Sequence, residues 1–296
     1  MGIVLKAFDP ELERVVALKL LAPALAANPE SRERFLHEAR AGAKLQHENV
    51  MPIYAVDQHG TYPYLVMPLV DGPNLQEHLD RNAPLPIDEI VRIAHQACRA
   101  LEEAHANGLV HRDIKPANIM LIGDAAEEPR RVWLTDFGLA HAATAPIAGR
   151  DARLITGTPG FMAPEQIRGG AIDPRTDLFA FGSVLYAIAS DGRSPFQSDS
   201  IAGTMERVQS HAPAPLTTIT KGLPDWFDHL VFRLLEKDPD KRPNSATEVR
   251  QILERHLPER RKLSVRRTIL ISAAVATITA ILTSLSIFRK ENGVAN

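Results

Sequence analysis

Residues 111–118 read His-Arg-Asp-Ile-Lys-Pro-Ala-Asn, and a second short motif, Asp-Phe-Gly, follows at residues 136–138. Together they place carboxylates, an ammonium and an amide in two short segments. Carboxylate and amide oxygens are hard ligands, which suit Mg²⁺ when it keeps some water and shares its shell with phosphate oxygens. Phosphoryl transfer needs such a metal, groups that hold the phosphates and a carboxylate that orients the attacking hydroxyl. The two motifs therefore indicate this class of chemistry.

Two further motifs lie in order on either side. Val16-Ala17-Leu18-Lys19 precedes the first pair and Ala163-Pro164-Glu165 follows it. Each motif alone is weak evidence, because three-letter strings occur by chance, but four in register are specific. In order and spacing, residues 2 to about 256 resemble the eukaryotic-type serine/threonine protein kinase family, especially its bacterial branch.

The resemblance implies an α+β fold with two lobes. A small strand-rich N-lobe is expected at residues 1–70 and a helical C-lobe at residues 71–257. It also implies an enzyme that uses ATP and Mg²⁺ to phosphorylate serine or threonine in protein substrates.

The resemblance assigns roles to the polar residues of the motifs. Asp113 accepts or orients the proton of the substrate hydroxyl, and Lys115 stabilises the transferring phosphoryl group. Asn118 and Asp136 hold magnesium. Lys19 binds the α- and β-phosphates and pairs with a glutamate on a following helix.

The glutamate that matches the family pattern is Glu38, and Glu33 is the less favoured alternative. These two residues are five positions apart, so on one helix only one of them can face Lys19.

The same alignment predicts the adenine pocket, whose residues are Val4, Ala17, Met67, Val70 and Met120. Pro68 stands where the family usually has an acidic hinge residue; its carbonyl and the N–H of Val70 still suffice for adenine.

The substrate class and its control follow from residues 111–118, which resemble the catalytic loop of the family, and from the segment before residue 163. Lys115 and the Gly-Thr-Pro sequence at residues 157–159 resemble serine/threonine kinases, and Thr158 is expected near Asp113 and Lys115. Arg112, next to Asp113, suggests control by phosphorylation, because a buried cation gains a partner when a nearby threonine acquires phosphate. Thr144 and Thr156 are the candidate threonines; the alternative is that each is simply a polar loop residue.

Three more residues carry structural roles by the same resemblance. Glu165 and Arg242 form a buried ion pair, and Asp177 braces the backbone of the catalytic loop. The single cysteine, Cys98, lies in an apolar helical pattern and is expected to be a small core residue rather than a reactive thiol.

Hydrophobic periodicity predicts the main elements. Alternation indicates a β-hairpin and two further strands, and a period near 3.6 indicates helices, the last of which opens with Ser245 and Glu248 as a capping box. The predicted strands are 3–8, 15–20, 50–54 and 64–70, and the predicted helices are 31–45, 87–106, 177–189, 224–236 and 245–256.

Composition agrees with a folded domain and excludes one class of partner. The chain has 296 residues, of which 45% are hydrophobic and 24% charged, as in globular proteins. The net charge of -2 mixes both signs, so no polyanion-binding field is expected and nucleic acid is not a predicted partner.

The C-terminal residues have a different character. Residues 258–267 form a basic linker, residues 268–288 contain no charge, and residues 289–296 form a short tail. About twenty uncharged residues can span a bilayer as a helix, although a buried core helix is the alternative. Because the heavier basic cluster precedes the span, the catalytic part is expected in the cytoplasm, on a single-pass protein of a bacterial inner membrane.

The N-terminus begins inside the glycine-rich loop of the family pattern, in which Gly2 corresponds to the third glycine and Val4 to the valine after it. The first strand and two glycines are therefore expected upstream.

The main alternative function is a weakly active or inactive scaffold with the kinase fold, and a small-molecule kinase of similar fold is less favoured. A homodimer that phosphorylates itself in trans is also consistent with the resemblance.

Overall fold

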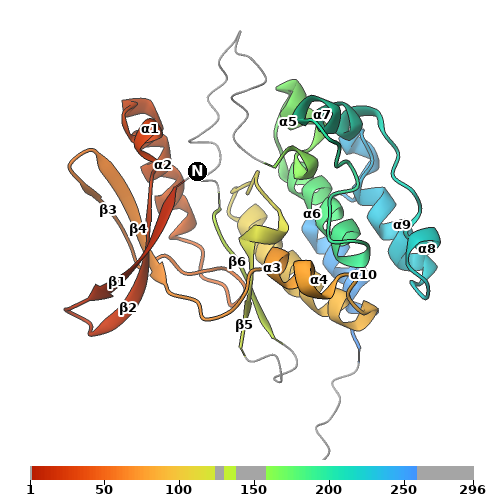
Figure 1. The fold of residues 1–296 in the computed structure, drawn as a ribbon, viewed down its shortest axis with the longest axis horizontal. Coiled ribbons are helices and arrows are strands. Elements are labelled where there is room, and N and C mark those ends of the chain that lie inside the picture. The colour runs from red at the N-terminus through yellow and green to blue at the C-terminus, as the bar shows by residue number, and fades with distance from the viewer. Residues whose placement is uncertain (1, 124–129, 138–157, 259–296) are drawn as a thin grey trace, which may run out of the picture. The chain divides into compact units, whose positions relative to one another are not determined.

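The computed structural model describes residues 2–123, 130–137 and 158–258 (Figure 1). The elements within these ranges are, in chain order, β1 Ile3–Asp9, β2 Arg14–Leu20, α1 Pro23–Ala26, α2 Pro29–Gly42, β3 Ala55–His59, β4 Tyr62–Pro68, α3 Leu75–Asn82, α4 Ile87–Ala106, β5 Ile119–Ile122, β6 Arg131–Leu134, α5 Pro164–Arg168, α6 Pro174–Ala189, α7 Ile201–Ser210, α8 Leu216–Ile219, α9 Asp225–Leu234 and α10 Ala246–Glu254. The strands of the first 70 residues and the helices that follow confirm the predicted strand-rich and helical lobes.

The first lobe is built on an antiparallel sheet of four strands in the order β1-β2-β4-β3. The predicted hairpin is confirmed, since β1 pairs with β2 from Ile3 opposite Leu20 to Asp9 opposite Arg14. Asp9 stabilises the turn because its carboxylate accepts the backbone N–H groups of Glu11 and Leu12 at 3.2 Å.

The strand predicted at residues 50–54 is wrong; β3 begins at Ala55 instead. The N–H of Met51 donates to the carbonyl of Leu134, in the second lobe, whereas the N–H of Tyr54 donates to Val66 in the first. Pro52, between them, has no N–H to give to either partner. This segment therefore joins the two lobes and is not a strand of the sheet.

Helix α2 covers one face of the sheet, and its buried side chains Phe35 and Ala39 pack with Leu65 of β4 in a small core. Asn28 caps the helix, since its side chain accepts the N–H of Glu30 at 2.9 Å. The helix ends at Gly42, three residues before the predicted end, and the half-buried Glu38 lies on it.

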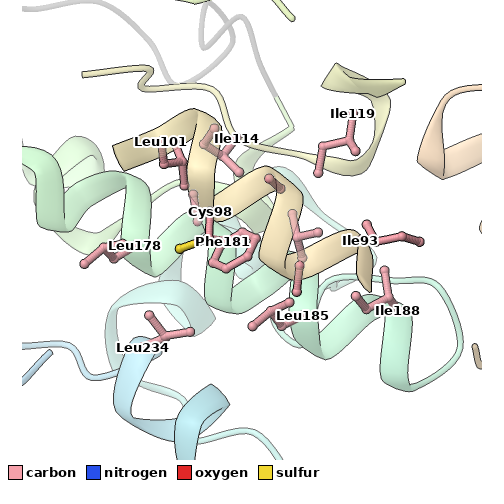
Figure 2. Close-up of a cluster of buried hydrophobic side chains, with 14 of the residues drawn as sticks. Ile93, Cys98, Leu101, Ile114, Ile119, Leu178, Phe181, Leu185, Ile188 and Leu234 are labelled. Carbon is pink, nitrogen blue, oxygen red and sulfur yellow. The ribbon is translucent and has the colours of Figure 1, made fainter. Parts of the chain in front are cut away.

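The core of the second lobe lies where α4 and α6 pack together (Figure 2). Helix α4 has the predicted bounds, and α6 is buried along nearly its whole length, as its apolar sequence predicts. Gly182 of α6 allows α9 to approach closely, because a Cβ at this position would lie 2.6 Å from that of Leu234. Cys98 is fully buried, and burial raises the pKa of its thiol, which agrees with a core residue.

The predicted membrane span, residues 268–288, lies outside the described residues. Within the described ranges, no helix has both the length and the apolar character needed to cross a bilayer.

Candidate active site

One buried carboxylate holds the backbone of the catalytic loop. Asp177, at the start of α6, accepts the N–H of His111 at 2.8 Å and that of Arg112 at 2.7 Å. A ring nitrogen of His105, on α4, lies 2.8 Å from the same carboxylate. Asp177 is fully buried, so these contacts satisfy a charge that would otherwise be costly to bury. The bracing that the sequence assigned to Asp177 is thus visible, whereas the sequence reasoning missed His105.

His111 connects the catalytic loop to the segment before Asp136. Its Nδ1 accepts the N–H of Asp113 at 3.3 Å, and therefore the proton is on Nε2, which donates to the carbonyl of Thr135 at 2.7 Å. The N–H of Thr135 donates to the carbonyl of Asn118 at 2.9 Å. Both the backbone N–H and the backbone carbonyl of Thr135 are thus hydrogen-bonded to the loop, which fixes the backbone position of Asp136 relative to Asp113.

Three polar side chains of the loop converge. Lys115 Nζ lies 2.7 Å from Asp113 Oδ2, and Asn118 Nδ2 donates to the same oxygen at 3.0 Å. Asn118 Nδ2 also donates to the backbone carbonyl of Asp113 at 2.8 Å. Since these bonds use the nitrogen of the Asn118 amide, its oxygen is left for another partner. Asp113 is thereby oriented by two cooperating donors.

The lysine predicted to bind phosphate contacts the aspartate predicted to bind the metal. Lys19, on β2, is buried, and its Nζ lies 2.5 Å from Asp136 Oδ2. Of the two candidate glutamates on α2, Glu38 is half-buried and Glu33 is exposed. The Lys19–Glu38 pair remains a prediction.

The adenine-pocket residues of the first lobe lie on one face of the sheet. Val4 is opposite Lys19, and Ala17 is opposite Met67. Directly opposed residues and alternate residues of a strand share a face, so all four side chains lie on the lysine-bearing face.

The pocket's remaining residues adjoin the link between the lobes. Met120, on β5, forms an isolated β-bridge with Asn74. Asn74 follows the half-buried Val70 by a few residues in the chain. The next residue, Leu121, donates its N–H to the carbonyl of Pro73 at 3.0 Å. The structure thus places Met120 beside the chain that leaves the predicted hinge.

Two residues of the site have backbone angles that side chains rarely adopt. The φ angles of Arg112 and Asp136 are +66° and +68°. The left-handed region costs a residue with a Cβ roughly 1 kcal/mol or more, and it persists where surrounding contacts enforce it. The hydrogen bonds from Arg112 to Asp177 and around Thr135 supply that enforcement.

The segment from Thr158 onward is attached to the catalytic loop. Gln166 Nε2 donates to the carbonyl of Arg112 at 2.8 Å, and Gln166 Oε1 accepts the N–H of Ala163 at 2.9 Å. Sequence reasoning missed Gln166. Thr158 is exposed, and its predicted bond near Asp113 stays a prediction. The candidate phosphorylation sites Thr144 and Thr156 lie outside the described residues.

The predicted structural pair lies beneath this segment. Glu165 makes two hydrogen bonds with the Arg242 guanidinium, at 2.8 and 2.9 Å, and accepts the Thr176 hydroxyl at 2.9 Å. Burial raises the pKa of Glu165, but the hydrogen bonds and charge of Arg242 outweigh that effect and hold the pKa below its ordinary value. Glu165 is therefore an anion at neutral pH.

The predicted magnesium ligands of the site are Asn118 and Asp136. In the described ranges, no group of three or more His, Cys, Asp or Glu side chains is placed to bind a metal by itself. Asn118 and Asp136 provide two oxygen ligands of the kind that Mg²⁺ shares with phosphate oxygens and water. The donor set therefore fits a metal that arrives with a nucleotide.

A two-lobed fold whose joined lobes place a lysine, an aspartate and a polar catalytic loop side by side is that of the protein kinases. Residues 1–256 match the family model described as the protein kinase domain, and the chain belongs to this family.

Curated relatives agree with this assignment. The chain is 37% identical to the serine/threonine-protein kinase Pkn1 of Myxococcus xanthus, over 86% of this chain and 36% of that protein. It is 35% identical to the serine/threonine-protein kinase PknB of Mycobacterium leprae, over 83% of this chain and 39% of that protein. The chain thus spans less than half the length of these curated relatives.

A solved structure supports the fold. The Mycobacterium tuberculosis PknI kinase domain is 28% identical, with a TM-score of 0.68, over 86% of this chain and 91% of that one. The predicted bilobal kinase fold is confirmed.

Proposed function

We propose that the chain transfers the γ-phosphate of ATP to serine or threonine hydroxyls of proteins. The observation that carries the proposal is the ion pair between Lys19 of the first lobe and Asp136 of the second, at 2.5 Å. Asp136 is itself tied through the Thr135 peptide to Asn118 and so to Asp113. Residues with distinct roles in phosphoryl transfer therefore lie in one connected cluster.

Each residue of the cluster has a physical role. Asp113, oriented by Lys115 and Asn118, accepts the hydrogen bond of the attacking hydroxyl and aligns its oxygen. Lys115, within hydrogen-bond distance of that carboxylate, neutralises charge on the transferring phosphoryl group. Lys19 binds the phosphates nearer the nucleoside, and Val4, Ala17, Met67, Val70 and Met120 enclose the base. Asn118 and Asp136 would hold Mg²⁺ together with the phosphates, and the metal would supply neutralisation of the triphosphate charge.

The transfer assay uses Mg²⁺, ATP labelled on its γ-phosphate and a generic protein substrate, followed by phosphoamino-acid analysis. We expect label on serine or threonine, and a loss of at least about 100-fold in Asp113→Asn, because a positioned general base contributes roughly that much or more. Equal labelling by both proteins would end the enzyme proposal. Nucleotide binding without transfer by the unaltered chain would instead support the scaffold alternative.

We also propose that residues 268–288 anchor the chain as a single membrane helix, with the catalytic part in the cytoplasm. Support comes from the uncharged segment and the basic linker before it. An arginine in the middle of a span costs about 2.5–3.5 kcal/mol of insertion free energy. The full chain expressed in bacteria should therefore sediment with membranes after a high-salt wash, and Val275→Arg/Ile278→Arg should move it to the supernatant. A matched exposed change, Leu12→Arg, should not, and sedimentation unaffected by the paired arginines would contradict the anchor.

A further proposal concerns control by a second copy of the chain. Among the described residues, the buried Nε of Arg112 has no hydrogen-bond partner, which suits a phosphate on Thr144 or Thr156. Mixed with the active chain, the inactive Asp113→Asn chain should acquire phosphate at one of these threonines in a mass-spectrometric map. Phosphate confined to the active copy would exclude transfer in trans.

A further inference from the structure

Lys237 is a half-buried lysine outside the cluster described above, with a buried ammonium nitrogen. It lies between α9 and α10, and in the described part of the chain its Nζ is buried without a hydrogen-bond partner. The ammonium lies instead over two aromatic rings, 3.9 Å from the centroid of Phe196 and 5.1 Å from that of Phe179. A desolvated ammonium at these distances is attracted to the negative faces of the rings. Lys237 is therefore held by cation–π contacts.

The charges around Lys237 make it an unusual lysine. Burial lowers its pKa first, and the nearby guanidiniums of Arg242 and Arg168 lower it further, whereas Glu236 raises it. The resulting pKa is about 8. Glu165, which is close to Arg242, is already paired with that guanidinium. Keeping a charged Lys237 in the fold at neutral pH therefore costs free energy, which suggests that the ammonium has a use other than stability.

Phe196 connects Lys237 to the segment beside the catalytic loop. The Phe196 N–H donates to Ser194 Oγ at 3.2 Å, and the Ser194 hydroxyl donates to the carbonyl of Gly160. The contact is close, because a Cβ at Gly160 would lie 2.7 Å from Ser194 Oγ. Residues 194–196 thus hold the backbone at Gly160.

The same rings meet the ion pair that holds α5. Phe179 and Phe196 stack with centroids 5.6 Å apart and an angle of 12° between their planes. The Arg242 guanidinium lies 4.9 Å from the centroid of Phe179 and donates to the Lys237 carbonyl at 3.3 Å. Lys237 therefore contacts two residues that help to hold residues 158–166 in place. Phe196 acts through Ser194 on Gly160, and Arg242 acts through its ion pair with Glu165.

Residues 158–166 adjoin the catalytic loop, since Gln166 Nε2 donates to the carbonyl of Arg112, the residue before Asp113. We propose that Lys237 is a positioning residue for the protein substrate, whose ammonium pins Phe196 and, through Ser194, the backbone at Gly160. The inference rests on the proposed kinase function. It predicts an effect on the protein substrate that ATP does not share.

The kinetic test compares Lys237→Met, Lys237→Arg and Lys221→Met, the last being a change of an exposed lysine. Loss of the cation–π contacts should raise the KM for the protein substrate about 2- to 30-fold in Lys237→Met, with the KM for ATP unchanged. Lys237→Arg should keep the KM for the protein substrate close to that of the unaltered chain, because arginine also stacks on aromatic rings. An equal rise of both KM values, or no rise, would overturn the proposal.

The pH dependence of the KM for the protein substrate distinguishes the charge of Lys237 from the shape of its side chain. As pH rises through about 8, Lys237 loses its proton and its attraction to the rings. The KM for the protein substrate should therefore rise between pH 7 and pH 9 more steeply in the unaltered chain than in Lys237→Arg, whose guanidinium stays charged. Parallel profiles would overturn the role of the ammonium.

Two measurements do not depend on activity, so they remain informative if the chain transfers no phosphate. Lys237→Met should melt no lower than the unaltered chain, because it removes a buried charge. Amide hydrogen exchange at Phe161 and Met162, which donate to Thr158 and Pro159, should nevertheless be faster in Lys237→Met than in Lys221→Met. A lower melting temperature with unchanged exchange would show a merely structural lysine and overturn the proposal.

Discussion

At the scale of single residues, two buried carboxylates of the second lobe are each matched by several partners. Asp177 is surrounded by two backbone N–H groups and His105, and Glu165 by Arg242 and Thr176. A buried charge with such partners is tolerated, whereas one that loses its partner is strongly destabilising. The catalytic loop and the segment after Thr158 are thus fixed by interactions whose loss has a measurable cost.

Removal of one member of the buried pair should show this cost. Arg242→Met leaves Glu165 buried without its cation, so the free energy of unfolding should fall by about 3–5 kcal/mol. The matched change Arg233→Met breaks the largely exposed pair with Glu248 and should cost about 1 kcal/mol or less. Urea unfolding measures both, and similar losses in the two variants would contradict the account.

The pH dependence of the same pair has a definite sign. The pKa of Glu165 is lower in the folded chain than its ordinary value of about 4.3, so the ionised carboxylate stabilises the fold above that pH. This contribution is lost as pH falls through the folded pKa. In Arg242→Met the effect of burial is no longer offset and raises the pKa of Glu165, so protonation of this carboxyl relieves the variant as pH falls. The difference in unfolding free energy between the unaltered chain and Arg242→Met should therefore shrink from pH 7 to pH 4, and shrink further below about pH 4.3, where the unaltered chain loses its own contribution. A difference that does not change with pH would show that Arg242 does not lower the pKa of Glu165.

At the scale of elements, the N-terminus of α10 differs in detail from its prediction. The Ser245 hydroxyl accepts the N–H of Glu248 at 3.2 Å, as a capping box requires. The Glu248 carboxylate, however, accepts the N–H of Asn244 at 2.9 Å, one residue before the cap. The sequence pattern indicated the helix start, whereas the return bond depends on the conformation of the residues before it.

Ser245→Ala removes the acceptor for a backbone N–H and should lower the free energy of unfolding by about 1 kcal/mol. Ser245→Asn keeps a capping oxygen and should lose a few tenths of a kcal/mol at most. Urea unfolding of the two variants checks the prediction. Equal stability of Ser245→Ala and the unaltered chain would show that the cap contributes nothing.

The elements that the sequence predicted well are those in which local pattern and burial agree. Helix α4 has a long apolar stripe that becomes one face of the core, so periodicity alone gives its bounds. Residues 50–54 are apolar enough for a strand, but their backbone partners belong to different lobes, which no local pattern reveals. Helix α3 was not predicted, because only Leu75 and Leu79 are buried along it.

The candidate site likewise contains residues that the sequence predicted and residues that it did not. The polar groups of residues 111–118 and Asp136 could be read directly, because their chemistry follows from side-chain type and spacing. His105 and Gln166 could not, since each contacts the loop only after tertiary folding brings distant segments together. Lys237 was missed because its aromatic partners come from α6 and the loop after it.

At the scale of the whole molecule, the two lobes of the kinase fold meet at Lys19 and Asp136. A nucleotide that binds there stabilises only the folded chain. MgATP at about 100 times its dissociation constant should raise the free energy of unfolding by roughly 2.7 kcal/mol. Thermal unfolding with and without MgATP tests this, and Lys19→Met or removal of Mg²⁺ by a chelator should reduce the shift. An unchanged shift in Lys19→Met would place the nucleotide elsewhere.

The central claim is that residues of both lobes form one phosphoryl-transfer centre. The most direct measurement is kcat/KM for phosphate transfer by Lys19→Met, Asp113→Asn and the double variant, with the exposed Asp199→Asn as control. Residues that act as a unit are strongly non-additive, so the double variant should be no slower than the slower single variant, within a few-fold. If the double variant instead loses the product of the two single losses, Lys19 and Asp113 act independently and the single centre is contradicted.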